Sequence, residues 1–227
     1  MRGDTDSARR TVSSLHRRPR RRPPVALLRA AALLLALTAA TLGAACSGPS
    51  GGTPGGDAGE AGGSTETYTS RDYGFSITYD TLLTQGAPSE GDDSGAVFSI
   101  PFVDTEGARA ATAYLDGVQV SVFKLARAVS EGEVAGLEQQ VRDTVDGRMT
   151  KLRSGKIVEP VKRTTVNGTP GFTVSYTFAQ GGAAVSAVSA FLFSGEYQYE
   201  VTGQASDADR TRLEPVIEAA MASFTVL

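Results

Sequence analysis

The sequence predicts an α+β fold, in which an antiparallel β-sheet of about six or seven strands packs against two amphipathic helices. Short segments that alternate apolar and polar residues lie between tight-turn signals, as strands of an antiparallel sheet do. Two other segments change to the three- and four-residue spacing of a helix. No cysteine follows Cys46, so packing alone must hold this domain, residues 68–227, together.

The first predicted strands alternate apolar with polar side chains. Phe75, Ile77 and Tyr79 share one face, which predicts a half-buried strand. Pro101 lacks a donor N–H and indicates an edge or the end of a strand. The three strands are YGFSITYD at 73–80, AVFSIPFV at 96–103 and DGVQVSVFKL at 116–125.

A helix is predicted from Glu131 to Lys151. Ser130 and Glu133 have the spacing of a capping box, which satisfies free backbone donors at a helix start. One face of this helix carries the apolar residues Val134, Leu137, Val141, Val145 and Met149.

Four more strands and a final helix follow. Asn167-Gly168 is a strong hairpin signal, and Gly181-Gly182 and Ser194-Gly195-Glu196 mark two further turns. These turns separate strands at 156–166, 171–179, 184–193 and 197–205. The last helix is capped by Ser206 or Asp207, and Pro215 falls inside it unless it starts late. Its buried side carries Leu213, Ile217, Ala220, Met221 and Phe224.

Residues 1–45 are predicted to be a secretory signal peptide. Nine of the 22 Lys and Arg residues are arginines within the first 29 positions, while the chain from Cys46 onward has a net charge of −10. The basic stretch precedes an uninterrupted apolar run at 30–45, which is 16 residues long. A membrane-spanning helix needs about 20. A short apolar run that ends in small residues is typical of a signal peptide, and an uncleaved signal anchor is the alternative.

Cys46 ends this apolar run. The residues before it, Leu42, Gly43, Ala44 and Ala45, resemble a bacterial lipobox, although Gly43 stands where that motif prefers Leu. The resemblance implies cleavage between Ala45 and Cys46 and attachment of acyl chains to the Cys46 thiol, with palmitate among them. Two or three chains anchor a protein stably. The alternative is ordinary cleavage after Ala45, which would leave a free thiol.

Residues 46–67 form the predicted linker. Eight of the 20 residues at 47–66 are Gly, and none is aromatic or β-branched aliphatic, so the segment cannot offset its ordering entropy by burial. A Gly-rich coil of this length spans about 25 Å. We therefore expect a disordered tether between the lipid anchor and the domain.

Three stretches of the domain resemble the Mog1/PsbP-like group, including actinobacterial lipoproteins of the LpqN kind. They are YTSRDYGFSITYD, TTVNGTPGFTVSYTF and IEAAMASF. Asp80 to Leu83 depart from the group, which often has Pro and Trp after the first strand. The resemblance implies an antiparallel sheet with helices against it and no shared activity.

The residues that remain for chemistry are few. The only histidine, His16, lies in the signal, which argues against Ser-His-Asp, Cys-His and Cys/His zinc sites in the mature chain. Glu159 and Glu200 are the candidate acid/base pair, but outward-facing positions in strands explain them more simply. We expect no catalytic residues, metal or cofactor.

Tyr73, Tyr197 and Tyr199 are the candidate ligand-facing aromatics, because rings with polar tips suit sugar or lipid pockets. Packing within the core is the alternative. The acidic mature chain argues against nucleic acid as a partner.

The expected function is therefore a non-enzymatic binding module, lipid-anchored on the outer face of the cell membrane, with an envelope protein or lipid as partner. A cell-wall hydrolase using carboxylates or Tyr, and a solute-capture module for a transporter, are the alternatives.

Overall fold

The computed structural model describes residues 63–91, 94–110 and 113–227, together with a two-residue strand at 37–38. Cys46, the cleavage position and the predicted linker up to residue 62 lie outside the described residues. In chain order, the elements are β1 (Leu37–Thr38), β2 (Thr65–Ser70), β3 (Phe75–Asp80), β4 (Thr84–Gln85), β5 (Phe98–Val103), β6 (Arg109–Ala110), β7 (Ala113–Tyr114), β8 (Gly117–Val129), α1 (Glu131–Val134), the 3-10 turn η1 (Ala135–Leu137), α2 (Glu138–Met149), β9 (Lys156–Val166), β10 (Thr169–Gln180), β11 (Ala183–Ser206), α3 (Arg210–Ser223) and β12 (Thr225–Val226).

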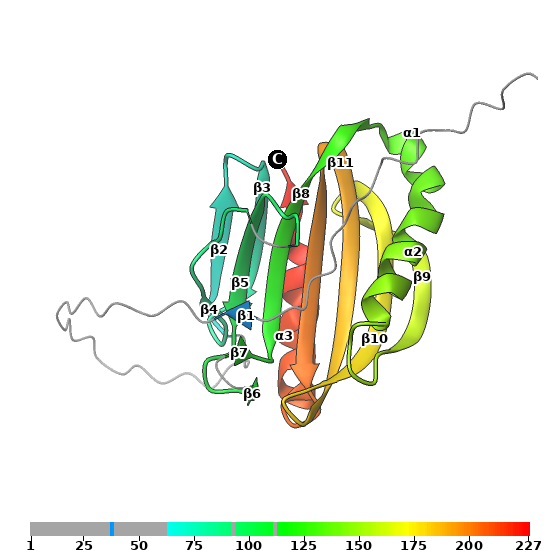
Figure 1. Cartoon of the computed structure of the whole chain (residues 1–227). Helices are drawn as coiled ribbons and strands as arrows, with labels where there is room; N and C mark the ends of the chain where they lie inside the picture. The colour runs from blue at the N-terminus through cyan, green and yellow to red at the C-terminus, as the bar shows by residue number, and fades with distance from the viewer. Residues whose placement is uncertain (1–36, 39–62, 92–93, 111–112) are drawn as a thin grey trace, which may run out of the picture.

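The main sheet is antiparallel, and its strand order is β4-β5-β8-β11-β10-β9. The predicted α+β fold class is confirmed: helices cover both faces of this sheet, with α3 behind it and α2 in front of β9 and β10 (Figure 1). A short ladder, β1-β7-β6, lies beside the sheet. None of the helices within the described ranges is long and apolar enough to cross a bilayer.

β11 is a hairpin in itself. Its first arm pairs with β10 and its second arm pairs with β8. The Ser189 and Thr202 hydroxyls bond across the arms at 2.7 Å, and the Asp207 N–H donates to the Ala184 carbonyl at 3.0 Å. Gly195, with φ of 57°, lies where the chain reverses, and Figure 1 shows the two orange arms side by side. The predicted turn at 194–196 is therefore confirmed, and the sheet has seven antiparallel segments.

One predicted strand belongs to a different sheet. β3 does not join the main meander but lies in a three-stranded sheet of order β12-β3-β2. β2 begins at Thr65, three residues before the expected start of the domain, and neither β2 nor β12 is apparent from the sequence pattern. Only one residue of β2, Ser70, is buried, so this strand lacks the alternation that reveals β3.

The helices follow the predicted periodicity with small changes. The first helical stretch begins at Glu131 as predicted, passes through η1 and ends at Met149. Glu133 accepts hydrogen bonds from both the backbone N–H and the hydroxyl of Ser130, at 3.0 and 2.7 Å, so the predicted capping box is present.

The predicted cap of the last helix is wrong. Ser206 is still the last residue of β11 and is buried there, so it cannot start the helix. Asp209 is the N-cap of α3. Pro215 lies inside the helix, where its ring removes one backbone donor, and it is exposed.

The core is divided by the sheet into two clusters, because successive side chains of a strand point to opposite faces. Leu192 of β11 packs in the α3 cluster, whereas its neighbours Phe191 and Phe193 pack in the α2 cluster. The largest fully buried side chains of the α3 cluster are Phe75, Phe102, Phe224, Ile77, Ile100, Leu83 and Leu192.

α3 lies directly on the backbone of β11 at Gly203. A Cβ atom at this position would come within 2.1 Å of Ile217 Cγ2 and 2.9 Å of Met221 Sδ. Only glycine therefore allows the helix its observed closeness to the strand.

Gly203→Ala should destabilise the domain by about 1–3 kcal/mol, because the added methyl group overpacks the contact with α3. Gly147→Ala is the control: its Cβ would meet nothing within 4 Å, and removing a glycine from the last turn of α2 should stabilise by about 0.5–1 kcal/mol. Urea unfolding of both variants measures the difference, and equal midpoints would show that α3 is not seated as described.

Glu133→Gln tests the capping box through pH. The hydrogen bonds from Ser130, with the nearby Arg127 charge, lower the pKa of Glu133 from 4.5 to about 2. Because the folded-state pKa is depressed, this carboxylate stabilises the fold fully above about pH 4.5, and the effect disappears as the pH falls to about 2. The melting temperatures of wild type and variant should therefore differ most above pH 5 and converge near pH 2. A difference independent of pH would argue against this role.

Candidate functional site

A groove of about 510 Å³ lies on the α3 side of the sheet. β9, β10 and both arms of β11 form its floor and one wall, and α3 forms the other wall. It exists because α3 lies over β8 and the second arm of β11 and leaves the outer strands on that face uncovered.

The floor of the groove combines hydroxyl and aliphatic side chains. Thr173, Ser175 and Thr177 alternate along β10 and face the groove, because the residues between them point into the α2 cluster. Val188 lies opposite Ser175 in the β10–β11 ladder and is 37% exposed. The aliphatic side continues onto α3 through Ile217.

The walls carry charges of both signs. On β9, Lys162 pairs with Glu159 at 2.8 Å, and this ammonium group, with the Ser175 hydroxyl, lowers the pKa of the Glu159 carboxyl. On α3, Arg210 lies 3.5 Å from Glu214. Both pairs are about half exposed, so they contribute little to stability and are available to a ligand.

Asn167 fixes the end of the groove wall. Its side-chain Nδ2 donates to the carbonyls of Ala222 and Phe224, at 2.8 and 2.9 Å, at the C-terminus of α3. The backbone has φ of 44° at Asn167 and 82° at Gly168, which forms the predicted two-residue turn between β9 and β10. This turn therefore ties α3 to the floor strands, and together with the contact at Gly203 it holds the width of the groove.

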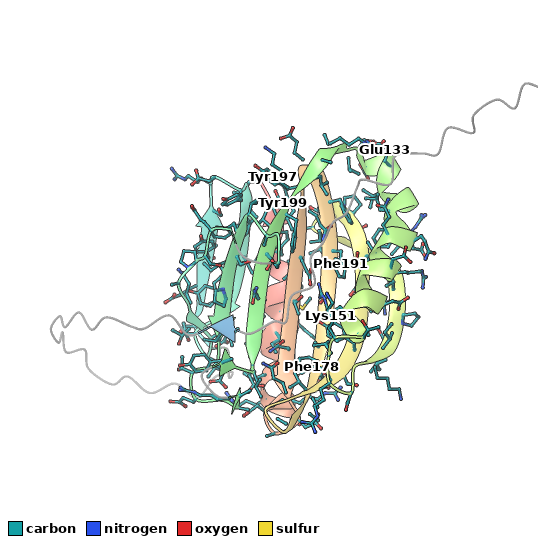
Figure 2. All side chains as sticks on the ribbon, in the orientation of Figure 1. Glu133, Lys151, Phe178, Phe191, Tyr197 and Tyr199 are labelled. Atoms are coloured by element: carbon teal, nitrogen blue, oxygen red, sulfur yellow. The ribbon has the colours of Figure 1, made fainter. Side chains whose placement is uncertain are left out.

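The three tyrosines predicted to face a ligand lie together, but at another place. Tyr73 and Tyr197 stack edge to face with centroids 6.2 Å apart, and the Tyr199 hydroxyl donates to the Tyr73 carbonyl at 2.8 Å. Tyr199 is buried, and burial raises its pKa. Figure 2 shows Tyr197 and Tyr199 at the upper end of the sheet, and none of the three lines the groove. The structure gives them packing contacts, and a ligand at this cluster stays a prediction.

A buried ion pair that sequence analysis did not identify joins α2 to β11. Arg148 donates two hydrogen bonds to the Glu200 carboxylate, at 2.5 and 2.9 Å, and both side chains are at least nine-tenths buried. The Arg148 guanidinium also lies 5.7 Å from the ring of Phe191. Although burial opposes the charge, Glu200 raises the pKa of Arg148 above its usual value. The signal in the sequence was the position of Arg148, seven residues after Val141 on the apolar face of α2.

A second polar cluster fixes the loop before β8. The fully buried Asp116 accepts hydrogen bonds from the backbone N–H groups of Ala108 and Ser206. Burial raises the pKa of Asp116, while these two bonds oppose the shift. Arg212 of α3 bonds to the buried Asp104 in the same loop. The cluster explains the acids of this region as structural contacts.

The candidate acid/base pair does not form. Glu159 lies on the groove side of the sheet, whereas Glu200 faces α2 on the opposite side. Within the described parts of the chain, no three His, Cys, Asp or Glu side chains come close enough to hold a metal ion.

Comparison with known proteins gave matches among solved structures only. No family model matches the sequence, and no curated protein matches it. Among solved structures, the cyanobacterial PsbP protein CyanoP from Synechocystis sp. PCC 6803 is 12% identical with a TM-score of 0.48, over 76% of this chain and 98% of that chain. LpqN of Mycobacterium tuberculosis, described as involved in cell envelope biogenesis, is 12% identical with a TM-score of 0.44, over 72% of this chain and 84% of that chain. The matches thus include a PsbP protein and LpqN, the two kinds of domain that the sequence resembles.

Glu200→Gln should destabilise the protein by about 3–5 kcal/mol, because it leaves the buried Arg148 charge without its partner. The double variant Arg148→Met with Glu200→Leu should recover most of this loss, since it removes both charges and keeps the space filled. Urea unfolding of the full chain measures both. A single variant within about 1 kcal/mol of wild type would contradict the burial of this pair.

Proposed function

We propose that the mature chain is a non-enzymatic lipoprotein of the cell envelope, anchored through Cys46, which presents its domain for binding to another envelope component. The observation that carries this proposal is the position of Cys46, directly after a short apolar run that ends in small residues and directly before a Gly-rich tract. Acyl chains on this sulfur would hold the protein on the outer face of the membrane, and the tract would leave the domain free to orient.

The groove supports a binding role for the domain. It is formed by rigid elements, because α3 is fixed to the floor strands at Gly203 and at Asn167. Four of its charged side chains are about half exposed and form two ion pairs, Lys162 with Glu159 and Arg210 with Glu214. A general acid needs a raised pKa, whereas the Lys162 ammonium group and the Ser175 hydroxyl lower the pKa of Glu159.

Cys46→Ala tests the anchor. In a bacterial host fed labelled palmitate, the wild-type chain should take up the label and partition into the detergent phase of a Triton X-114 extract. The variant should remain unlabelled, because it lacks the thiol that accepts the lipid. Gly43→Leu is the matched control, since it completes the lipobox and should be labelled at least as well as wild type.

A wild-type protein that is unlabelled and shows a free Cys46 thiol by intact mass would contradict the anchor. Release of such a protein into the medium would favour ordinary cleavage after Ala45 instead.

A further inference from the structure

Two of the exposed aliphatic residues of the described domain lie in the groove. Within the described ranges, the exposed large hydrophobic side chains are Leu82, Val158, Val188 and Leu227, and two of them, Val158 and Val188, line the groove. Val158 is 59% exposed and Val188 is 37% exposed. Water-exposed aliphatic groups that share one concave surface favour an apolar group of a ligand at that surface.

The hydroxyl row beside them argues against an acyl chain as the occupant. Thr173, Ser175 and Thr177 of β10 and Ser186 of β11 line the same floor. The Ser175 hydroxyl already donates to the Glu159 carboxylate at 3.3 Å. A hydrocarbon chain along this floor would remove water from the other three hydroxyls and return no hydrogen bond, and each loss costs about 1–3 kcal/mol. The occupant must therefore carry donors and acceptors as well as apolar groups.

The absence of an aromatic platform argues against a sugar. Tyr176 is the only aromatic residue among those that line the groove. Its ring packs in the α2 cluster 6.1 Å from that of Phe178, and its hydroxyl is within 3.2 Å of Ser189, so the ring faces the other side of the sheet. The rings on which sugars stack in many sites are missing from this floor.

The charged side chains on the two walls of the groove restrict the charge of the ligand. Glu159 and Lys162 give the β9 wall both signs, and Arg210 with the two acids Glu214 and Glu218 does the same on the α3 wall. A ligand of one sign would meet a repelling group on each wall. A ligand with charges of both signs, separated by an apolar group, would be complementary to both walls.

We propose that the groove binds a segment of a partner polypeptide, with an aliphatic side chain over Val188 and charged side chains of both signs towards the walls. A peptide backbone supplies the donors and acceptors that the hydroxyl row requires, and its side chains supply the apolar group and the charges. The inference rests on the proposed binding role, but it depends only on the groove and not on the anchor at Cys46.

The test is selection of phage-displayed random peptides on the full mature chain, performed in parallel with the Cys46→Ala chain so that anchoring does not affect the result. Selected peptides, made synthetically, should bind both chains equally in fluorescence polarisation. Val188→Asp should weaken binding at least about tenfold, because it places a charge on the aliphatic floor. Leu82→Asp is the matched control, since Leu82 is 49% exposed and does not line the groove, and it should bind as wild type does.

A charge exchange separates binding from a structural role. The double variant Glu159→Lys with Lys162→Glu keeps the ion pair but reverses the charges along the β9 wall. Peptides selected on it should show the opposite order of charges from those selected on wild type, while its urea midpoint stays unchanged. The same peptides selected on both chains would overturn the proposal.

Three other results would also overturn it. These are selection of no peptide, binding to phosphatidylglycerol vesicles that Val188→Asp abolishes, and self-association in sedimentation that Val188→Asp abolishes. The second would indicate a lipid ligand and the third an interface between copies of this chain. If the wild-type chain takes up no lipid label but still binds the selected peptides, only the proposed anchor at Cys46 is contradicted.

Discussion

Two helices must cover two faces of one sheet, and the rest of the structure depends on where each helix lies. α2 and η1 pack over the outer strands β9 and β10 on one face, and α3 packs over β8 and the second arm of β11 on the other. Neither helix covers a whole face. The α3 face is therefore open over β9, β10 and the first arm of β11, and the groove lies there. On the α2 face, the half that α2 does not cover lies over β8 and the second arm of β11. It carries buried amide and hydroxyl side chains such as Gln119, Ser121 and Thr202 in place of a hydrophobic cluster.

The contacts that keep α3 in place are therefore also the contacts that define the groove. A glycine lets the helix approach the strand, and one asparagine in a turn holds the C-terminus of the helix. Gly203 lies in β11 and Asn167 in the turn between β9 and β10, so the wall of the groove is fixed to the sheet that forms its floor. Such preorganisation lowers the ordering cost of binding.

Most of the fold could be predicted from the sequence, because period-two and period-3.6 patterns record which side of an element is buried. The capping box at Ser130, the Asn167-Gly168 turn and the hairpin at Gly195 were all recognisable from local chemistry. β2 and β12 were not recognisable. β12 has only two residues, and β2 is exposed along most of its length, so neither has an alternation to detect.

The groove could not be predicted, because its parts come from β9, β10, β11 and α3, and only tertiary packing brings them together. The ion pair between Arg148 and Glu200 was missed for the same reason. Arg148 stands on the apolar face of α2, but its partner lies 52 residues away in the sequence. The three tyrosines are the opposite case. Their ring chemistry suggested a ligand site, but the Tyr199 hydroxyl donates to the backbone carbonyl of Tyr73.

The entry point of the chain has a geometric consequence. The described domain begins beside β2, which lies at the left of Figure 1, while β9 forms the opposite border of the main sheet. Under the proposed anchoring, a tether would reach the domain beside the small β12-β3-β2 sheet and leave the outer strands unconstrained. The opposite side of the domain would then face away from the membrane, where large partners could approach it without steric hindrance.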